Sequence, residues 1–167
     1  MKAIVAVDNS WGIGYQGNLL AMIPEDLKYF KEKTLGQTVV MGRTTLESLP
    51  MGKPLKDRVN IVLSRDVSYE NDQVVLMRTI DELFDKLPLY QNEIFVIGGE
   101  SVYRQLLPHC EEAYVTKIDQ TYSADKHFVN LDQHPDWELV STSEVQYFNE
   151  IPFTFNKYRN RNLKKSI

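Results

Sequence analysis

Asp26 occupies the position in this sequence that most clearly suggests chemistry. Pro24 suits the first position of a helix, and the segment IPEDLKYFKEKT predicts a helix over residues 24–35. One side of this helix carries Ile23, Leu27, Phe30 and Thr34. At about 100° per residue, Asp26 lies beside Phe30, at the edge of the apolar face. The carboxylate could be the acid of a buried site, or it could only favour the first helical turn through the helix dipole.

A second candidate lies where the segment VVMGRTTLES passes from a predicted strand into a predicted helix. Thr44 and Glu47 fit the S/T-x-x-E capping box, which predicts that the helix begins there. The free backbone N–H groups of a helix start, together with the neighbouring Arg43, could hold a phosphate group. Gly42 by itself indicates only a turn.

Two further predicted strands end in residues of a similar kind. The segment IVLSR ends in Ser64 and Arg65, and FVIGGESVY continues through Gly98 and Gly99, which permit a close approach of the backbone to a ligand. Neither the dinucleotide fingerprint G-x-G-x-x-G nor the P-loop motif G-x-x-x-x-G-K-[ST] occurs at these places. Each strand end alone indicates only a turn, but together they predict an extended ligand that carries phosphate.

The elements that must position these residues alternate between strand and helix. Near-continuous apolar runs are typical of parallel strands covered on both faces: AIVAV, TVVMG, NIVLS, QVVLM, EIFVIGG and EAYVTKI. Helical patterns lie between several of them, at residues 24–35, TTLESL, TIDELFDKL and SVYRQLL. This order predicts an α/β fold whose ligands bind beyond the carboxyl ends of the strands.

The C-terminal part departs from this alternation. WELVSTSEVQYF and FTFNKYRNR read as strands on either side of NEIP, which predicts an antiparallel hairpin at one edge of the sheet. The sheet is therefore predicted to be mixed and mostly parallel.

Composition narrows the function classes. The chain has 167 residues, 43% of them hydrophobic and 25% charged, which is typical of one ordinary globular domain. A net charge of -4 predicts no broad nucleic-acid surface, and no apolar run approaches the length of a membrane span. The single cysteine, Cys110, cannot form an intramolecular disulfide, and we expect a reducing, cytoplasmic setting. The scattered histidines lack metal-ligand spacing, so we expect no metal.

Six strings of the sequence, in their order and spacing, resemble the dihydrofolate reductase family: VAVDNSWGIGYQGNLL, IPEDLKYFKEKTLGQTVVMGRTTLESLP, PLKDRVNIVLSR, VIGGESVYRQLLP, AYVTKID and ADKHF. The resemblance extends from Ala3 to about Arg159. It implies a single domain over residues 1–167, with an eight-stranded mixed sheet and about four flanking helices. It also implies reduction of 7,8-dihydrofolate to tetrahydrofolate by NADPH, in support of one-carbon and thymidylate metabolism.

On this resemblance Asp26 is the family's buried acid and the catalytic residue. Its carboxylate would pair with an amino group and a ring N–H of the pterin, while hydride passes to C6 and an ordered water protonates N5. Thr116 would hydrogen-bond Asp26 and the pterin amino group. Arg58, otherwise a surface arginine before a strand, would grip the glutamate α-carboxylate of the substrate. The other substrate-binding residues that it implies are Ile4, Val5, Ala6, Leu27, Phe30, Leu49, Leu55, Ile97 and Tyr103.

The resemblance places the cofactor at the three strand ends. Arg43, Ser64 and Arg65 would bind the 2′-phosphate of NADPH. The nicotinamide would be lined by Ala6, Ile13, Ser48 and Ile97. The remaining cofactor-binding residues implied are Gly14, Leu19, Gly42, Thr44, Thr45, Leu63, Arg78, Gly98, Gly99, Glu100, Ser101, Val102 and Tyr103. In the family the glycine pair is commonly joined by a cis peptide.

Residues 9–23 correspond to the family's mobile closing loop, and Asp125 to the partner loop that contacts it. Two positions depart from the family. Ala21 stands where an aromatic residue usually packs over the pterin, with Met22 able to fill part of the space. Ala124 stands where a glycine often precedes the loop aspartate. These departures bear on proton delivery and on the motion of the loop.

The resemblance implies small-molecule partners, dihydrofolate and antifolate inhibitors, and a monomer with no nucleic-acid or membrane partner. Two other functions fit parts of the pattern. A related reductase acts on a pyrimidine intermediate of riboflavin synthesis, but Asp26 together with Arg58 favours a pterin-glutamate substrate. A folate- or nucleotide-binding protein that has lost catalysis is supported only by Ala21.

Overall fold

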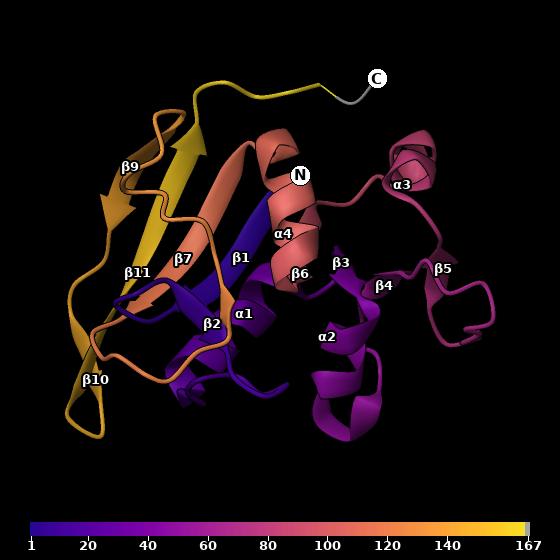
Figure 1. Cartoon of the computed structure of the whole chain (residues 1–167). Helices are drawn as coiled ribbons and strands as arrows, with labels where there is room; N and C mark the ends of the chain where they lie inside the picture. Colours follow the sequence, from indigo (N-terminus) through magenta and orange to yellow (C-terminus); the bar gives the residue numbers. More distant parts are fainter. Residues whose placement is uncertain (166–167) are drawn as a thin grey trace.

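The structure, a computed structural model that describes residues 1–165, is built around one large β-sheet with helices on both faces (Figure 1). The strands of this sheet are β1 (Lys2–Val7), β3 (Thr38–Gly42), β4 (Val59–Leu63), β5 (Val75–Met77), β6 (Ile94–Gly98), β7 (Glu112–Ile118), β9 (Trp137–Thr142), β10 (Gln146–Phe148) and β11 (Ile151–Asn160). A separate small sheet pairs β2 (Gly12–Gly14) with β8 (Lys126–His127).

The strand order across the large sheet is β10-β11-β7-β1-β6-β3-β4-β5, and β9 also pairs with β11. The strands from β7 to β5 pair in parallel, whereas β11 runs antiparallel to β7, β9 and β10. Because β9 and β10 pair with different stretches of β11, they share one edge and the sheet is eight strands wide. The predicted mixed sheet, with its antiparallel C-terminal hairpin, is confirmed.

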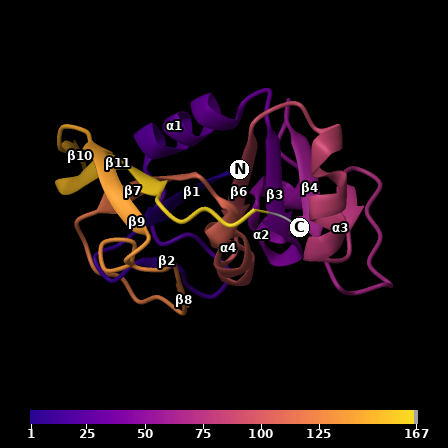
Figure 2. The same cartoon turned by 90° about the horizontal axis from the view of Figure 1, so that it is seen from above.

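Four helices cover the sheet: α1 (Pro24–Thr34) and α2 (Arg43–Ser48) on one face, α3 (Ile80–Lys86) and α4 (Glu100–Leu106) on the other. Single 3-10 turns lie at Pro50–Gly52, Leu87–Leu89 and Leu107–His109. Successive strand residues point to opposite faces, so Val39 and Met41 pack with α1 and α2 while Val40 packs with α3 and α4. In Figure 2, α1 and α4 lie on opposite sides of the sheet. Nowhere in residues 1–165 does a helix have the length and apolar character needed to cross a bilayer.

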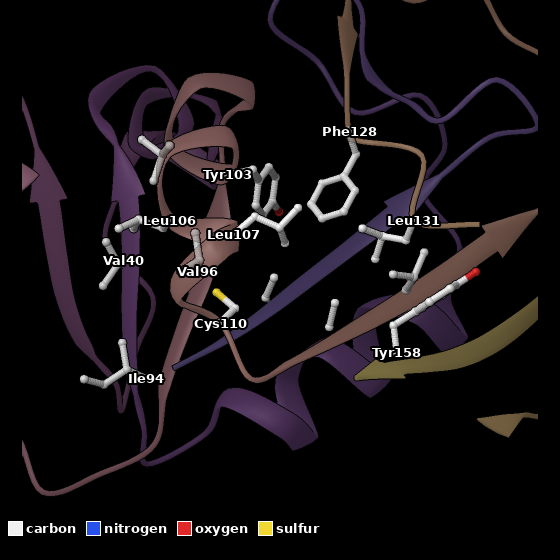
Figure 3. Packing of buried hydrophobic residues seen from close by; sticks show 14 of the residues in the cluster. Val40, Ile94, Val96, Tyr103, Leu106, Leu107, Cys110, Phe128, Leu131 and Tyr158 are labelled. Atoms are coloured by element: carbon white, nitrogen blue, oxygen red, sulfur yellow. The ribbon is translucent and has the colours of Figure 1, made fainter. Parts of the chain in front are cut away.

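The larger core fills the space between the sheet and helices α3 and α4 (Figure 3). Tyr103 and Phe128 meet there edge to face, with ring centroids 4.9 Å apart. Cys110 belongs to the same cluster and is fully buried, and burial raises the pKa of its thiol to about 12. A thiol that is inaccessible and stays protonated acts as a small apolar side chain and not as a nucleophile.

Helix α2 begins one residue before the predicted start, so the predicted capping box is wrong. The helix starts at Arg43, Gly42 is its N-cap, and no side chain caps it. Thr44 is therefore inside the first turn, and Glu47 instead accepts a bond from the Arg43 Nε at 2.8 Å, one helical turn apart. Strand β3 leads directly into the helix, so its last residue, Gly42, takes the N-cap position and has no side chain with which to cap it.

The turn of the C-terminal hairpin begins where predicted but is two residues shorter. Asn149 and Glu150 have φ values of 48° and 67°, a pair of positive values that matches the tight turn favoured by the twist of antiparallel strands. Strand β11 then begins at Ile151, so Ile151 and Pro152 belong to the strand and not to the turn.

Candidate functional site

Asp26 lies in the first turn of α1, next to the carboxyl half of β7. Its Oδ1 accepts a hydrogen bond from the Thr116 hydroxyl at 2.6 Å. Thr116 is buried and Asp26 is half-buried, so burial raises the pKa of the Asp26 carboxyl, while the bond from Thr116 opposes that rise. Among the described residues no group donates to Oδ2, which leaves that oxygen available to a ligand. A helix-dipole contact alone would require neither the burial nor the partner on β7.

The middle of β1 lies beside this pair. Ala6 is in register with Thr116, and Ile4 with Tyr114 on the same strand. The backbone carbonyl of Ile4 accepts a bond from the Tyr103 hydroxyl at 2.7 Å, which ties α4 to this strand. Tyr103 is only 4% exposed, so it supports the site from within the core.

The helical face that carries Asp26 is not fully covered by the protein. Phe30 and Val5 are half-buried, but Leu27 is 41% exposed, although the helical pattern groups it with Phe30. The structure thus leaves an apolar side chain open next to the half-buried carboxylate. That arrangement suits a ligand that has both a flat apolar ring and hydrogen-bond donors.

Arg58 lies at the other end of α1. Its Nη1 donates to the Thr34 hydroxyl at 3.0 Å, and its Nε donates to the Lys56 carbonyl at 2.9 Å. Burial lowers the pKa of Arg58, but an arginine remains a cation at any ordinary pH. The two bonds fix the direction of the guanidinium and leave Nη2 available for a carboxylate.

Asn60 positions this arginine, and the sequence did not identify it. Asn60 is 6% exposed, and its Oδ1 accepts from the Leu55 backbone N–H at 2.9 Å. Its Nδ2 donates to the carbonyls of Leu55 and Arg58, at 2.9 and 3.0 Å. These bonds fix the loop that presents Leu55 and Arg58, while Leu49 packs in the same cluster as Leu55. The only signal in the sequence was a polar residue inside an apolar strand, NIVLS.

Two of the three predicted phosphate-binding strand ends touch one another. The Gly98–Gly99 peptide is cis, and Gly98 has a φ of 142°. A Cβ on Gly98 would lie 3.0 Å from the Thr45 Oγ1, and one on Gly99 would lie 3.4 Å from the same atom. A Cβ on Gly42 would lie 3.3 Å from the Val102 side chain. Glycine is therefore favoured most strongly at position 98, where a positive φ and a close contact with Thr45 coincide, and the first turn of α2 packs closely against the turn between β6 and α4.

A cavity of about 320 Å³ opens at the third strand end, within the size range of small-molecule sites. It is lined by Leu63, Ser64, Arg65, Arg78, Thr79, Ile80, Asp81, Ser101, Val102 and Gln105. Six of these are among the residues that the resemblance assigned to cofactor binding: Leu63, Ser64, Arg65, Arg78, Ser101 and Val102. Arg43 is not in the lining and instead forms ion pairs with Glu47 and Asp66.

The other assigned residues lie on several different elements. Ile13 and Gly14 lie on β2, and Ile97 lies on β6. Ser48 closes α2, where its hydroxyl donates to the Thr45 carbonyl at 2.7 Å. At the start of α4, the carboxylate of Glu100 is occupied by Arg104 and by a backbone N–H of β8. No three His, Cys, Asp or Glu side chains within residues 1–165 are placed to hold a metal ion.

Asp8 anchors the start of the loop over residues 9–23, and the sequence did not identify it. Asp8 is 3% exposed. Its Oδ1 accepts from the backbone N–H groups of Ser10 and Gly12, at 2.9 and 2.8 Å, and its Oδ2 accepts from that of Tyr122 at 3.0 Å. The one sequence feature that could have indicated Asp8 is its position directly after an apolar strand, in the segment AVD.

The tip of this loop contacts the segment that includes Asp125. The Gln16 N–H donates to the Asp125 Oδ2 at 3.0 Å, and the Asp125 N–H donates to the Gly14 carbonyl at 2.9 Å. A Cβ on Gly12 would lie only 2.7 Å from the Cβ of Ala124. The methyl group of Ala124 therefore packs directly on the loop that the resemblance describes as mobile.

The two loop residues beside Asp26 differ in packing. Ala21 packs on the cluster of Ile23, Ile118 and Phe153, whereas Met22 is 58% exposed. Leu19, assigned to cofactor binding, is 59% exposed. Met22 is thus open to solvent and is not packed against the core.

Comparisons with known proteins agree with this fold. The family model for dihydrofolate reductase matches residues 1–160. The dihydrofolate reductase of Bacillus subtilis is 33% identical over 165 residues, which cover 98% of this chain and 96% of that protein. The dihydrofolate reductase of Staphylococcus aureus is 33% identical over 157 residues, covering 93% and 94%.

A solved structure is also similar: dihydrofolate reductase from Enterococcus faecalis in complex with NADP(H) and RAB-propyl. It superposes with a TM-score of 0.84 at 35% identity, and the match covers 95% of each chain. Fold, site and relatives together define an enzyme of the oxidoreductase class. The chain belongs to the dihydrofolate reductase family.

Proposed function

We propose that this chain reduces 7,8-dihydrofolate to 5,6,7,8-tetrahydrofolate with NADPH. The observation that carries the proposal is the half-buried Asp26 carboxylate, held at Oδ1 by Thr116 and without a partner at Oδ2. The family membership and the NADP(H) complex of the similar structure support the same reaction.

The substrate would bind with its pterin ring along α1. The Asp26 carboxylate accepts hydrogen bonds from the pterin amino group and from the adjacent ring N–H, and Thr116 contacts the same amino group. Ile4, Val5, Ala6, Leu27 and Phe30 line the ring. Leu49 and Leu55 flank the aminobenzoyl unit, and Arg58 binds the glutamate α-carboxylate with the N–H groups that Thr34 and Lys56 leave free.

The reaction requires a hydride at C6 and a proton at N5. The nicotinamide, when bound, supplies the hydride. Asp26 lies on the amino side of the ring in this pose, too far from N5 to protonate it directly, so a water carries the proton. The negative charge of Asp26 then favours the protonated N5 electrostatically. This role requires an ionised carboxylate close to the ring, and the hydrogen bond from Thr116 favours that ionised form against the effect of burial.

The residues at the three strand ends fit a dinucleotide cofactor. The close contact of Gly98 and Gly99 with Thr45 brings backbone from two strand ends together, and the arginine-lined cavity lies at the third. Arg65 and Arg78 supply positive charge in that cavity, and Arg43 lies next to it across Asp66. We assign the 2′-phosphate to Arg43, Ser64 and Arg65, so that NADPH is preferred to NADH.

The wider assignments follow from this reaction. Residues 1–167 act as one catalytic domain and as a monomer in the cytoplasm, and the product serves one-carbon and thymidylate metabolism. Antifolates of the diaminopyrimidine type pair with Asp26 in their protonated form. Size-exclusion chromatography with light scattering tests the monomer, since a dimer would double the 19.4 kDa mass.

A steady-state assay that follows NADPH absorbance with and without dihydrofolate tests the main proposal. Dihydrofolate-dependent oxidation of NADPH is the expected result. Activity only on a pyrimidine of riboflavin synthesis would assign the chain to the related reductase. Tight binding of both ligands without turnover would make it a binding protein.

A further inference from the structure

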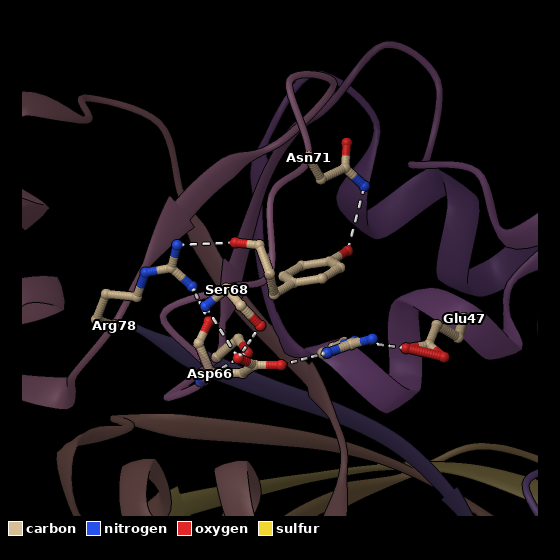
Figure 4. A network of polar contacts seen from close by, with 8 residues as sticks. Glu47, Asp66, Ser68, Asn71 and Arg78 are labelled. Atoms are coloured by element: carbon tan, nitrogen blue, oxygen red, sulfur yellow. Dashed lines mark hydrogen bonds and ion pairs between the residues drawn. The ribbon is translucent and has the colours of Figure 1, made fainter.

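The guanidinium of Arg43 is already surrounded by protein groups. Its Nε donates to the Glu47 Oε1 at 2.8 Å, and its Nη1 donates to the Asp66 Oδ2 at 3.2 Å. The ring of Tyr69 lies under its plane, with the Cζ atom 4.2 Å from the ring centroid. Asp66 lies on the loop that follows β4 (Figure 4), where its carboxylate accepts from Arg43 and its backbone carbonyl accepts from Arg78. A phosphate that binds Arg43 must therefore share it with Asp66.

Hydrogen bonds from Ser68 hold the Asp66 carboxylate in the orientation that contacts Arg43. Its Oδ1 accepts from the backbone N–H of Ser68 at 3.0 Å and from the Ser68 hydroxyl at 2.6 Å, which leaves Oδ2 for Arg43. Arg78 braces the loop by donating to the carbonyls of Asp66 and Tyr69. The carboxylate is thus fixed, and the bonds from Ser68 and the charge of Arg43 lower its pKa, so it is ionised at neutral pH.

The position of Asp66 relates it to one part of the cofactor. It follows Ser64 and Arg65 directly, and these line the cavity to which the 2′-phosphate is assigned. A carboxylate repels a phosphate but accepts a hydrogen bond from a free ribose 2′-hydroxyl, the arrangement by which dinucleotide sites select the non-phosphorylated cofactor. An arginine at the same place favours the phosphate. Here both groups occur in one ion pair.

We propose that Asp66 is a specificity-determining residue that weakens the preference for NADPH over NADH. Its carboxylate competes with the 2′-phosphate for Arg43, and it accepts a hydrogen bond from the 2′-hydroxyl of NADH. The inference rests on the proposed placement of the cofactor and adds an opposing residue to it. The arginines still favour NADPH, but by a smaller factor than they would without Asp66.

The expected effect on cofactor affinity is modest because the charged groups are exposed to solvent. The side chains of Arg43 and Asp66 are 41% and 49% exposed, so water and salt screen their charges. Removing one negative charge next to a phosphate at a surface of this kind corresponds to a change of about three- to tenfold in affinity. The change should shrink as ionic strength rises.

The test uses Asp66→Asn, which removes the charge and keeps the oxygen that accepts from Ser68. Asp72→Asn is the matched control, because it removes the same charge from the same loop and Asp72 makes no ion pair among the described residues. Calorimetric titration with adenosine 2′,5′-bisphosphate, AMP, NADPH and NADH isolates the 2′-phosphate. Asp66→Asn should bind the bisphosphate and NADPH about three- to tenfold more tightly, and it should bind AMP and NADH, which both carry a free 2′-hydroxyl, no more tightly than the wild type.

Two results would overturn the inference. Weaker binding of the bisphosphate by Asp66→Asn would show that Asp66 orients Arg43 for the phosphate and does not compete with it. Equal affinities in Asp66→Asn and Asp72→Asn would show that the charge does not reach the phosphate. Asp66→Glu, which keeps the charge, should retain the wild-type ratio of NADPH to NADH affinity. Because the mononucleotides carry no nicotinamide, these titrations are independent of whether the chain turns over dihydrofolate, which the absorbance assay measures separately.

Discussion

Replacing Asp26 with Asn removes the negative charge next to the pterin and changes little else. The amide oxygen can still accept the bond from the Thr116 hydroxyl, now 2.6 Å from Oδ1. The amide NH₂ replaces Oδ2, however, and presents a donor to the pterin donors. The variant therefore loses one charge-assisted pair with the substrate and the field that favours a protonated N5.

The size of the loss follows from that pair. A hydrogen bond to a charged group contributes about 1.5–3 kcal/mol, which corresponds to a drop of about 10- to 150-fold in kcat/KM at neutral pH. The loss should lessen as the pH falls, because protons from the solvent then take over a task that the carboxylate no longer supports. The wild type should behave in the opposite way at acidic pH. Burial raises the pKa of Asp26, so its kcat/KM should fall on acidification at a pH above the ordinary carboxyl range.

Thr116→Val tests the role of the Asp26 carboxylate independently, through its pKa. The bond from Thr116 opposes the rise in the Asp26 pKa, so its removal should move the acid limb of kcat/KM to higher pH. Stopped-flow and steady-state rates from pH 4.5 to 9 for the wild type and both variants measure these limbs. A native circular dichroism spectrum is the control for folding.

Two results would refute this reasoning. Unchanged kinetics in a folded Asp26→Asn protein would remove the carboxylate from the mechanism and leave it a helix-dipole contact. An acid limb that stays in place in Thr116→Val would show that Asp26 does not produce it.

Three further changes probe other parts of the site. Arg58→Leu should raise the KM for dihydrofolate far more than that for NADPH, while pterin fragments without the glutamate bind both proteins alike; equal losses for fragment and substrate would make Arg58 structural. Ala21→Phe should retain or raise activity, because the resemblance implies a site that accommodates an aromatic residue at this position; inactivity of the folded variant would contradict this. The double variant Arg43→Ala, Arg65→Ala should bring the KM for NADPH toward that for NADH. An equal loss of affinity for both cofactors would show that the 2′-phosphate does not bind at these arginines.

The sequence predicted helices and strands well where a single local signal, such as a proline or the spacing of apolar residues, determines the structure. Pro24 and the apolar spacing define α1, and alternation of Val39, Val40 and Met41 between the two faces explains why an unbroken apolar run forms a covered strand. The capping box failed because Glu47 also fits an ion pair with Arg43, four residues before it on the helix. With β3 leading straight into α2, Glu47 pairs with Arg43, and Thr44 is already inside the helix.

The site was predictable only in part, because several of its groups act through residues distant in the chain. Asp26 stood out by its place on a helix, but its partner Thr116 is 90 residues away. Asn60 and Asp8 fix loops by bonding backbone groups, and no motif marks a side chain with that role. Asp66 meets Arg43 only because β3 and β4 are neighbours in the sheet. Spacing within a segment cannot reveal such pairs.

The burial that equips Asp26 for its role should also make the protein less stable. Its pKa is higher in the folded than in the unfolded chain, so between the two values the folded state binds more protons and stability falls as the pH rises. The loss is complete above the folded pKa and absent below the ordinary carboxyl value. Asp26→Asn should therefore be more stable than the wild type at pH 7 and lose this advantage as the pH falls through that window.

Glu25→Gln is the matched control for this comparison, because Glu25 is exposed in the same helical turn and differs chiefly in burial. Its removal should leave stability unchanged or lower it slightly, through the helix dipole alone. Urea unfolding of the three proteins at several pH values from 4 to 8 measures the difference. If Asp26→Asn is destabilised at pH 7 as Glu25→Gln is, the carboxylate helps to hold α1 and carries no burial cost. If Asp26→Asn instead gains stability while it loses activity, the buried carboxylate destabilises the folded protein. That result is expected of a group whose role is to bind a ligand.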